Sequence, residues 1–121
     1  MRRSHHRWPL PHRRHPSIHG IIALDIANPD KPVEVSRLTF PGDYRAHWTG
    51  WDAVTNRIVV TPGTDGVHRL YLVRFDQATG KLIVDESFRD KDGQPGFSFD
   101  NRKWPQGWTG SATPHGAVFS R

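Results

Sequence analysis

Two prolines, Pro29 and Pro32, separate two strand-like runs and restrict how this part of the chain can fold. The run over residues 20–25 is apolar and rich in isoleucine, and the run over residues 33–40 alternates with a period of two. Both patterns indicate β-strands. Because proline has no N–H to donate to a strand ladder, residues 28–32 are expected to form the connection between the two strands.

A short pattern occurs twice further along the chain, at residues 52–57 and 76–81, in the form Asp-x-x-Thr-(Asn/Gly)-(Arg/Lys). Its fifth residue is Asn or Gly, which are the residue types that most readily adopt a positive φ. Its aspartate can accept hydrogen bonds from backbone N–H groups of a turn. We therefore expect two hairpin loops that each join antiparallel strands.

The strands expected around these loops are residues 46–51, 57–61, 70–75 and 82–84, and a last short strand is expected over residues 117–121. Four consecutive antiparallel strands are the content of one β-propeller blade. The pattern therefore predicts an all-β, antiparallel fold.

The first run and its connection resemble the repeat of LVIVD-type β-propellers, whose relatives include the lactonase-like (YVTN-type) propellers and the selenium-binding-protein family. The closing phrase Pro-His-Gly-Ala-Val-Phe-Ser, residues 114–120, resembles the entry to an inner propeller strand. The resemblance covers residues 19–121 and implies a propeller fragment, preceded by a separate leader over residues 1–18. The residues that match the repeat are Gly20, Leu24, Asp25, Ile26, Ala27, Asn28, Pro29 and Pro32.

The resemblance implies about one and a half propeller-type blades: two strands of one blade, four of the next, and the opening strand of a third. Propellers typically have four to eight blades around a central channel, so we expect this chain to be a carboxy-terminal piece of a larger ring. Uncovered blade edges favour pairing with other chains, which predicts a homo-oligomer or aggregation.

The leader over residues 1–18 carries the chain's excess positive charge. Removing its five arginines from the 17 basic residues leaves 12, which equals the number of acidic residues. Three prolines and the lack of hydrophobic periodicity predict that the leader is disordered. A flexible basic arm can touch phosphate non-specifically, but the neutral body does not favour nucleic acid as a partner. A shifted reading frame or a late start codon would also produce such a leader.

The histidines in and beside the leader are irregularly spaced, so we expect no specific metal site there. They are His5, His6, His12, His15 and His19. No apolar stretch is long enough for a secretory signal or a bilayer span, which predicts no membrane partner and a cytoplasmic location by default. The absence of cysteine excludes disulfides, a thiolate nucleophile and Cys-based zinc sites.

His47 and His115 are the candidate metal ligands, and Arg45 and Trp48 beside His47 are further ligand-binding candidates. Each histidine stands at the start of an expected strand, and in propellers such first strands line the central channel. The resemblance to the selenium-binding-protein family implies channel histidines that bind a divalent transition metal. No cysteine matches that family's reactive cysteine, so selenium or thiol chemistry is not expected. The alternative is that each histidine only hydrogen-bonds a neighbouring strand or turn.

Other residue combinations do not predict a catalytic site. Asp85 and Glu86 are adjacent on a strand and should point to opposite faces, so they cannot share a proton. Asp90 and Asp92 lie among basic residues in a pattern typical of a solvated turn. No Gly-x-Ser-x-Gly motif orients a nucleophile. We therefore assign no catalytic residue.

Four tryptophans have the chemistry to stack on a sugar or a base, but in blades such residues usually pack between sheets, and we expect them in the core. They are Trp48, Trp51, Trp104 and Trp108. Three functions stay open. The first is a scaffold that binds a small molecule or a protein. The second is a self-associating module. The third is an enzyme, either a metal-dependent oxidoreductase or a lactonase-like hydrolase, with the two channel histidines at its centre.

Overall fold

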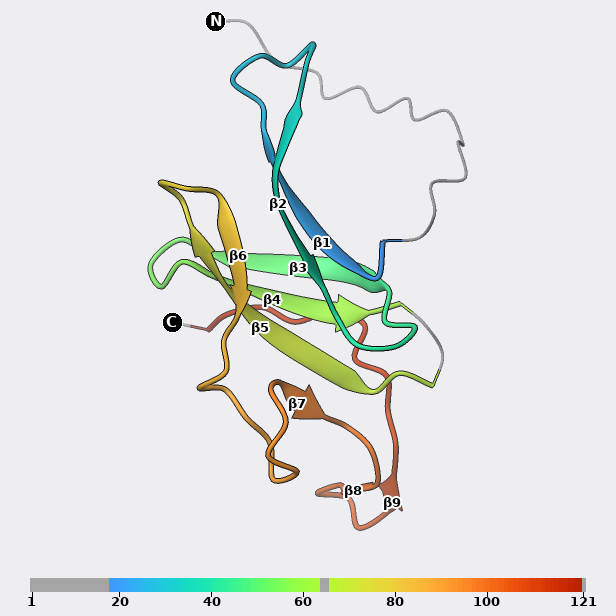
Figure 1. The fold of residues 1–121 in the computed structure, drawn as a ribbon. Coiled ribbons are helices and arrows are strands. Elements are labelled where there is room, and N and C mark those ends of the chain that lie inside the picture. Colours follow the sequence, from blue (N-terminus) through green and yellow to red (C-terminus); the bar gives the residue numbers. More distant parts are fainter. Residues whose placement is uncertain (1–17, 64–65, 121) are drawn as a thin grey trace, which may run out of the picture.

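The computed structural model describes residues 18–63 and 66–120, and this part of the chain is all-β, as predicted. Every strand pair is antiparallel, and the described residues contain no helix (Figure 1). Among these residues there is consequently no helix that could span a membrane. Apart from Ile18, the predicted leader lies outside the described residues.

The main sheet contains the four strands that the sequence predicts, in the order β3-β4-β5-β6, with the short β7 paired to the start of β5. Their bounds are β3 (Ala46–Asp52), β4 (Arg57–Pro62), β5 (Arg69–Asp76), β6 (Lys81–Val84) and β7 (Phe97–Ser98). From β3 to β6, each strand pairs with the strand that follows it in the sequence, so the main sheet is an antiparallel meander.

Both predicted hairpin loops are confirmed. Asn56 and Gly80 have positive φ angles of 52° and 73°. The carboxylates of Asp52 and Asp76 each accept a hydrogen bond from the backbone N–H two residues later, at 3.2 and 2.9 Å. The repeated pattern therefore acts as the sequence suggests, with the aspartate closing the turn and the fifth residue supplying the left-handed backbone.

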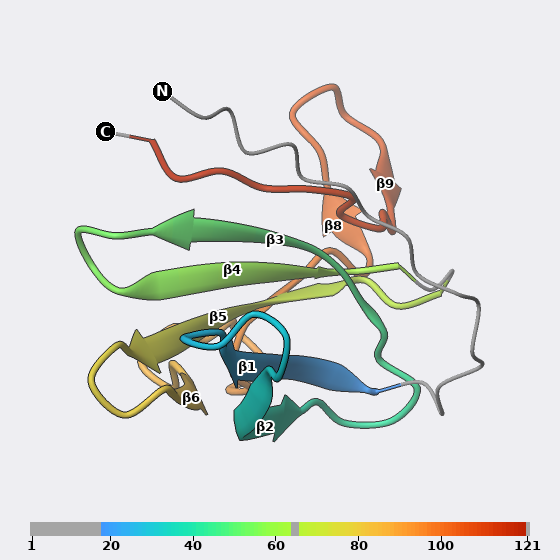
Figure 2. The same ribbon diagram turned by 90° about the horizontal axis from the view of Figure 1, so that it is seen from above.

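The prolines separate β1 (Gly20–Asp25) from β2 (Val33–Thr39), and these strands form a hairpin as predicted. In the connection, Asn28 accepts a hydrogen bond through Oδ1 from the N–H of Asp30 at 3.1 Å. The hairpin lies across one face of the main sheet, where β2 packs beside β6 (Figures 1 and 2). The Ser36 hydroxyl donates to the carbonyl of Gly80, which links β2 to the β5–β6 loop.

The core fills the space between this hairpin and the main sheet. Three aromatic rings form its centre: Phe40 stacks on Tyr71 at 4.4 Å, and Tyr44 lies edge-on to Tyr71 at 5.1 Å. Val60 and Val73 are fully buried beside them. Burial raises the pKa of the Tyr44 phenol, whose hydroxyl donates to the carbonyl of Val60 at 3.1 Å. The two layers are therefore held together by aromatic packing.

The strand predicted over residues 117–121 is wrong for residues 117–120, which form no strand. The C-terminal segment, residues 111–120, runs beside β3 (Figure 2). It contacts Trp48, Gly50 and Thr61, and the pairing of Trp48 with Thr61 places these residues on one face of the sheet. Because the segment packs on a face of the sheet, it does not join the ladder at the edge.

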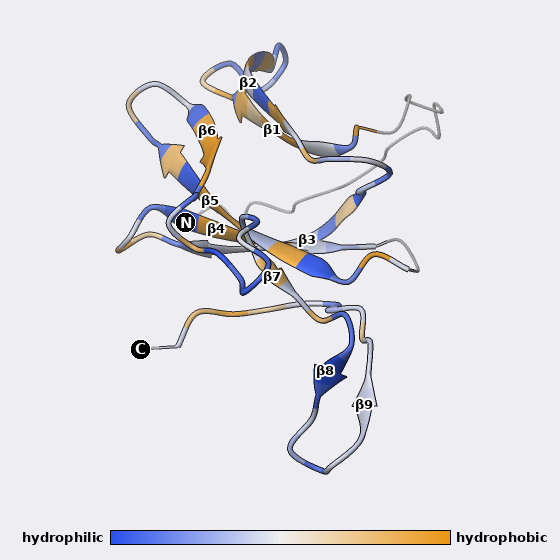
Figure 3. Ribbon diagram, turned by 60° about the horizontal axis from the view of Figure 1, so that its bottom comes forward, coloured by the Kyte–Doolittle hydropathy of each residue, from blue (hydrophilic) through white to orange (hydrophobic). Residues whose placement is uncertain are grey.

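The expected burial of the tryptophans is wrong for Trp108 and Trp51, which are 52% and 46% exposed. Trp108 belongs to a hairpin of β8 (Arg102–Lys103) and β9 (Thr109–Gly110) that stands away from the main sheet (Figures 1 and 3). Its ring stacks on that of Trp104 at 5.3 Å, and the N–H of Trp104 donates to its carbonyl at 2.9 Å. The two indoles pack on each other within the hairpin, which leaves Trp108 partly in solvent.

Candidate functional site

The structure brings the two predicted histidines together. The rings of His47 and His115 lie with their centroids 4.8 Å apart and their planes inclined by 53°. His47 belongs to β3, and His115 belongs to the C-terminal segment. Both residues are exposed, so their side chains are accessible to a ligand in solution.

An irregularity in β3 places His47. Ala46 pairs with Pro62 and Trp48 pairs with Thr61, so His47 is the extra residue of a β-bulge. Bulges re-aim a side chain and are common next to functional sites. A Cβ on Gly63 would lie 2.6 Å from the Cβ of His47, so only glycine leaves room for the bulge.

Contacts on the sheet face place His115. The hydroxyl of Thr61, a fully buried residue, donates to the carbonyl of His115 at 3.1 Å. The next residue, Gly116, lies against the indole of Trp48, about 3.6 Å from where a side chain would begin. These contacts hold the C-terminal segment over β3 and set its histidine beside His47.

The other two candidates, Arg45 and Trp48, are close to His47 in the sequence but make different contacts. Trp48 is half-buried beneath Gly116, so its ring supports the segment that carries His115. Arg45 is exposed, and its carbonyl accepts a hydrogen bond from the N–H of Gly63 at 2.8 Å. The backbone of Arg45 therefore holds Gly63, the residue that packs on His47, whereas Trp48 packs against the segment that carries His115.

The spacing of the two rings suits a shared metal ion. Two imidazoles that bind one tetrahedral zinc ion through their nitrogens have ring centroids about 5 Å apart. No cluster of three or more His, Asp or Glu side chains with metal-binding geometry occurs among the described residues. A metal bound by His47 and His115 would consequently keep positions open for water, a ligand or residues of another chain.

Sequence reasoning missed the environment of Asp90, for which it predicted a solvated turn. The Asp90 side chain is only 6% exposed and pairs with Arg102. Burial by itself would raise the pKa of this carboxyl, but hydrogen bonds from Arg102 and from the N–H groups of Ser98 and Lys91 lower it to about 2. The charges near Asp90 in the sequence gave no sign that a cation later in the chain would cover it.

The expectation that Asp85 and Glu86 are adjacent on a strand is wrong, because β6 ends at Val84 and both residues follow it, but their surroundings do differ. The Asp85 side chain is 2% exposed, whereas that of Glu86 is 72% exposed. Asp85 accepts hydrogen bonds from the N–H and hydroxyl of Ser87 at 3.1 and 2.5 Å, and from Nε of Arg57 at 2.8 Å. Because both of its carboxylate oxygens accept hydrogen bonds within the fold, Asp85 has a structural role.

Comparison with known proteins adds no relative. No family model matches the chain, and no curated protein or solved structure matches it. What the histidine pair does must therefore be inferred from its own geometry and chemistry.

Proposed function

We propose that this chain is a β scaffold of the propeller-blade type that binds a ligand through His47 and His115. The ligand that best suits two adjacent imidazoles is a divalent transition metal, because imidazole is a preferred donor for zinc, copper, nickel and iron. The four-stranded meander and the second layer packed on its face support the scaffold part of the proposal.

The observation that carries the metal site is the meeting of two rings from distant parts of the chain at 4.8 Å. A bulge, a glycine and a buried hydroxyl all contribute to this placement. A purely structural histidine needs only one hydrogen-bond partner. Here neither imidazole makes a hydrogen bond within the described residues, so both rings keep nitrogen atoms free for a ligand.

Calorimetric titration with zinc is expected to show one ion bound per chain. The leader histidines could also bind zinc, so the background protein carries His5→Gln, His6→Gln, His12→Gln and His15→Gln. In that background His47→Ala should weaken binding by more than the roughly 10–100-fold that loss of an outer-shell partner costs. His115→Ala should have the same effect, because each change removes one of the two imidazoles.

His68→Gln is the control for this titration. His68 directly precedes β5 and is partly buried, and its ring pairs with Asp100. Zinc affinity should be unchanged in this variant. Equal zinc binding by the background protein and by His47→Ala would contradict the proposed site, and circular dichroism would show whether each variant keeps its β fold.

A second candidate function, self-association, is favoured by the tip of the β1–β2 hairpin. Several large apolar side chains are exposed there, on a hairpin that projects beyond the main sheet (Figure 1). They are Leu24, Ile26, Val33 and Val35. Exposed apolar side chains on a projecting hairpin favour contact with another protein surface, and a second copy of this chain supplies the same tip.

Replacing Ile26 and Val33 with lysine is expected to convert an oligomer into a monomer, because charges would have to be buried in the contact. Light scattering after size-exclusion chromatography measures the change. Val54→Lys is the matched control, since Val54 is 72% exposed but lies on the β3–β4 loop. A native chain that is monomeric at high micromolar concentration would contradict this second function.

A further inference from the structure

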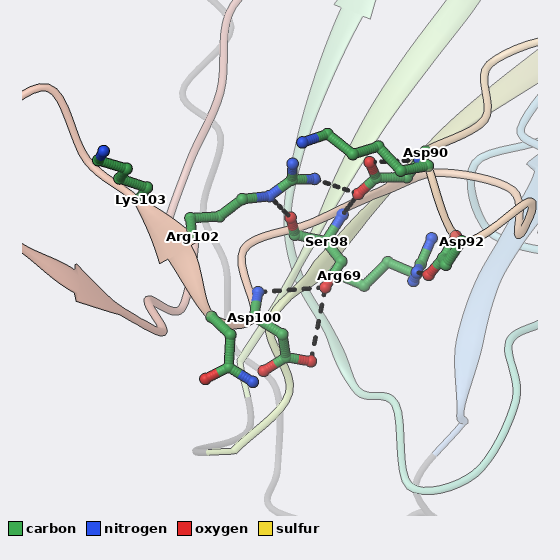
Figure 4. Close-up of a pocket in the computed structure, with 9 residues that line it drawn as sticks. Arg69, Asp90, Asp92, Ser98, Asp100, Arg102 and Lys103 are labelled. Carbon is green, nitrogen blue, oxygen red and sulfur yellow. Dashed lines mark hydrogen bonds and ion pairs between the residues drawn. The ribbon is translucent and has the colours of Figure 1, made fainter.

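A polar cleft of about 520 Å³ lies where β5, β7 and β8 meet the loop that follows β6, and neither residue of the histidine pair lines it. Every residue that lines the cleft is polar or charged (Figure 4). Four lining side chains are cationic and three are carboxylates, which gives the lining a formal charge of +1. A cleft of this size is within the usual range for small-molecule sites, but its lining suits a hydrophilic ligand.

Arg102 is held rigidly at the centre of the cleft. Its Nε donates to the carbonyl of Ser98 at 2.6 Å, and its Nη2 pairs with the carboxylate of Asp90 (Figure 4). Its guanidinium lies 4.2 Å from the centre of the Phe97 ring. These contacts leave Nη1 without a partner among the described residues. A pre-positioned guanidinium loses little conformational freedom when it binds an anion.

The other two carboxylates of the lining also have partners within the fold. Nη2 of Arg69 pairs with Asp92, and its Nη1 donates to the carbonyl of Pro95 at 2.7 Å. Asp100 pairs with the ring of His68. No carboxylate of the lining is therefore left to attract a cation by itself.

The two lysines of the lining are different. The ammonium groups of Lys91 and Lys103 have no hydrogen bond or ion pair with any residue that the structure describes. Lys103 lies on β8 at one side of the cleft (Figure 4), and Lys91 lies on the loop after β6. The charged donors of the cleft that have no partner among the described residues are thus Nη1 of Arg102 and the ammonium group of Lys103, both on β8, and the ammonium group of Lys91 on the loop after β6.

We propose that this cleft binds a small phosphate-bearing molecule, with Nη1 of Arg102 and the ammonium group of Lys91 as donors and Lys103 adding positive charge at its side. A phosphate group offers three or more acceptor oxygens in different directions, which suits donors that come from separate elements. The volume exceeds that of one phosphate, which leaves room for a polar body beside Asp100 and Asn101. This site goes beyond the histidine pair and uses neither of its residues.

Residue-resolved NMR titration tests the proposal, because the leader arginines can also bind phosphate non-specifically. The probes are inorganic phosphate, glycerol 3-phosphate and glycerol, added at constant ionic strength. Saturable shifts are expected at the amides of Lys91, Ser98 and Arg102. Tighter binding of glycerol 3-phosphate than of inorganic phosphate would identify a phosphate ester as the ligand class, and glycerol should not bind.

The double variant Lys91→Gln/Lys103→Gln should weaken phosphate binding by about tenfold or more, because it removes one charged donor and a second positive charge of the lining. The chain's other two lysines supply a matched control, Lys31→Gln/Lys81→Gln, which makes the same charge change elsewhere. Both pairs are exposed, so the variants should fold. The proposal is overturned if no saturable shift appears at the cleft, or if the two double variants weaken binding equally. Neither result would bear on zinc binding by the histidine pair.

Discussion

Replacing Phe40 with alanine is expected to lower the free energy of unfolding by about 3–5 kcal/mol, the usual cost of removing a buried aromatic side chain. Phe40 is 4% exposed and contacts two further rings, those of Tyr44 and Tyr71. It follows β2, whereas Tyr71 belongs to β5, so their stacking holds the β1–β2 hairpin on the main sheet. Whole domains are stabilised by only about 5–15 kcal/mol, and this single change should remove a large share.

Thermal and urea unfolding of Phe40→Ala, followed by the tyrosine signal in near-ultraviolet circular dichroism, would measure this loss. Phe88→Ala is the matched control, since Phe88 lies on the exposed loop after β6. An exposed position of this kind usually changes stability by only about 0.5 kcal/mol. Equal losses in the two variants would show that the aromatic cluster does not hold the layers together.

Asp85→Ala is expected to destabilise the fold by about 3 kcal/mol, the lower end of the range for breaking a buried ion pair. The change removes the acceptor for Ser87 and leaves the Arg57 guanidinium without its carboxylate. The cost stays at the lower end because Arg57 keeps 33% of its side chain in solvent. Urea unfolding at neutral pH measures it. Glu34→Ala, which breaks the exposed pair with Arg37, is the control and should have little effect.

The same carboxylate should make stability depend on pH. Hydrogen bonds from Ser87 and from Arg57 lower the pKa of Asp85 to about 2, compared with an ordinary value of 3.8. Because the folded pKa is the lower one, this stabilisation is complete above about pH 4 and is lost as the pH falls towards 2. The difference in unfolding free energy between the native chain and Asp85→Ala should shrink over that interval. A difference that stays constant from pH 6 to pH 2 would contradict the assignment.

Most of the strands and turns could be predicted because their signals are local. Asn56 and Gly80 take a positive φ, and Asp52 and Asp76 bind N–H groups two residues away. Such interactions depend only on neighbours in the sequence.

The failures concern segments whose environment is set by distant residues. The last segment was expected to form a strand, but Trp48 and Gly50 provide a face on which its backbone packs. Asp90 was expected in a solvated turn, but Arg102 covers it from β8. The sequence around Asp90 shows its neighbouring charges, but it does not show which distant charged residue will pack against the carboxylate. The burial of Asp90 could therefore not be predicted.

In the candidate site, too, some features could be predicted from the sequence and others depend on distant residues. His47 and His115 were chosen from the sequence because each stands before an expected strand, and the structure places their rings 4.8 Å apart. The bulge that carries His47 and the hydroxyl of Thr61 that holds His115 could not be predicted. Nor did the sequence indicate the polar cleft, since Lys91 lies on the loop after β6 and Lys103 lies on β8.

Local residue patterns were enough to predict the antiparallel all-β character, the two capped hairpin loops and the proline-bounded connection between β1 and β2. The reason is that φ preferences, side-chain turns and a missing N–H act within a few residues of each other. Three features became visible only in the folded chain: the hairpin packs on the main sheet through Phe40, the C-terminal segment runs beside β3, and two histidines meet. These features depend on contacts between segments far apart in the chain, and their stability comes from burial and packing.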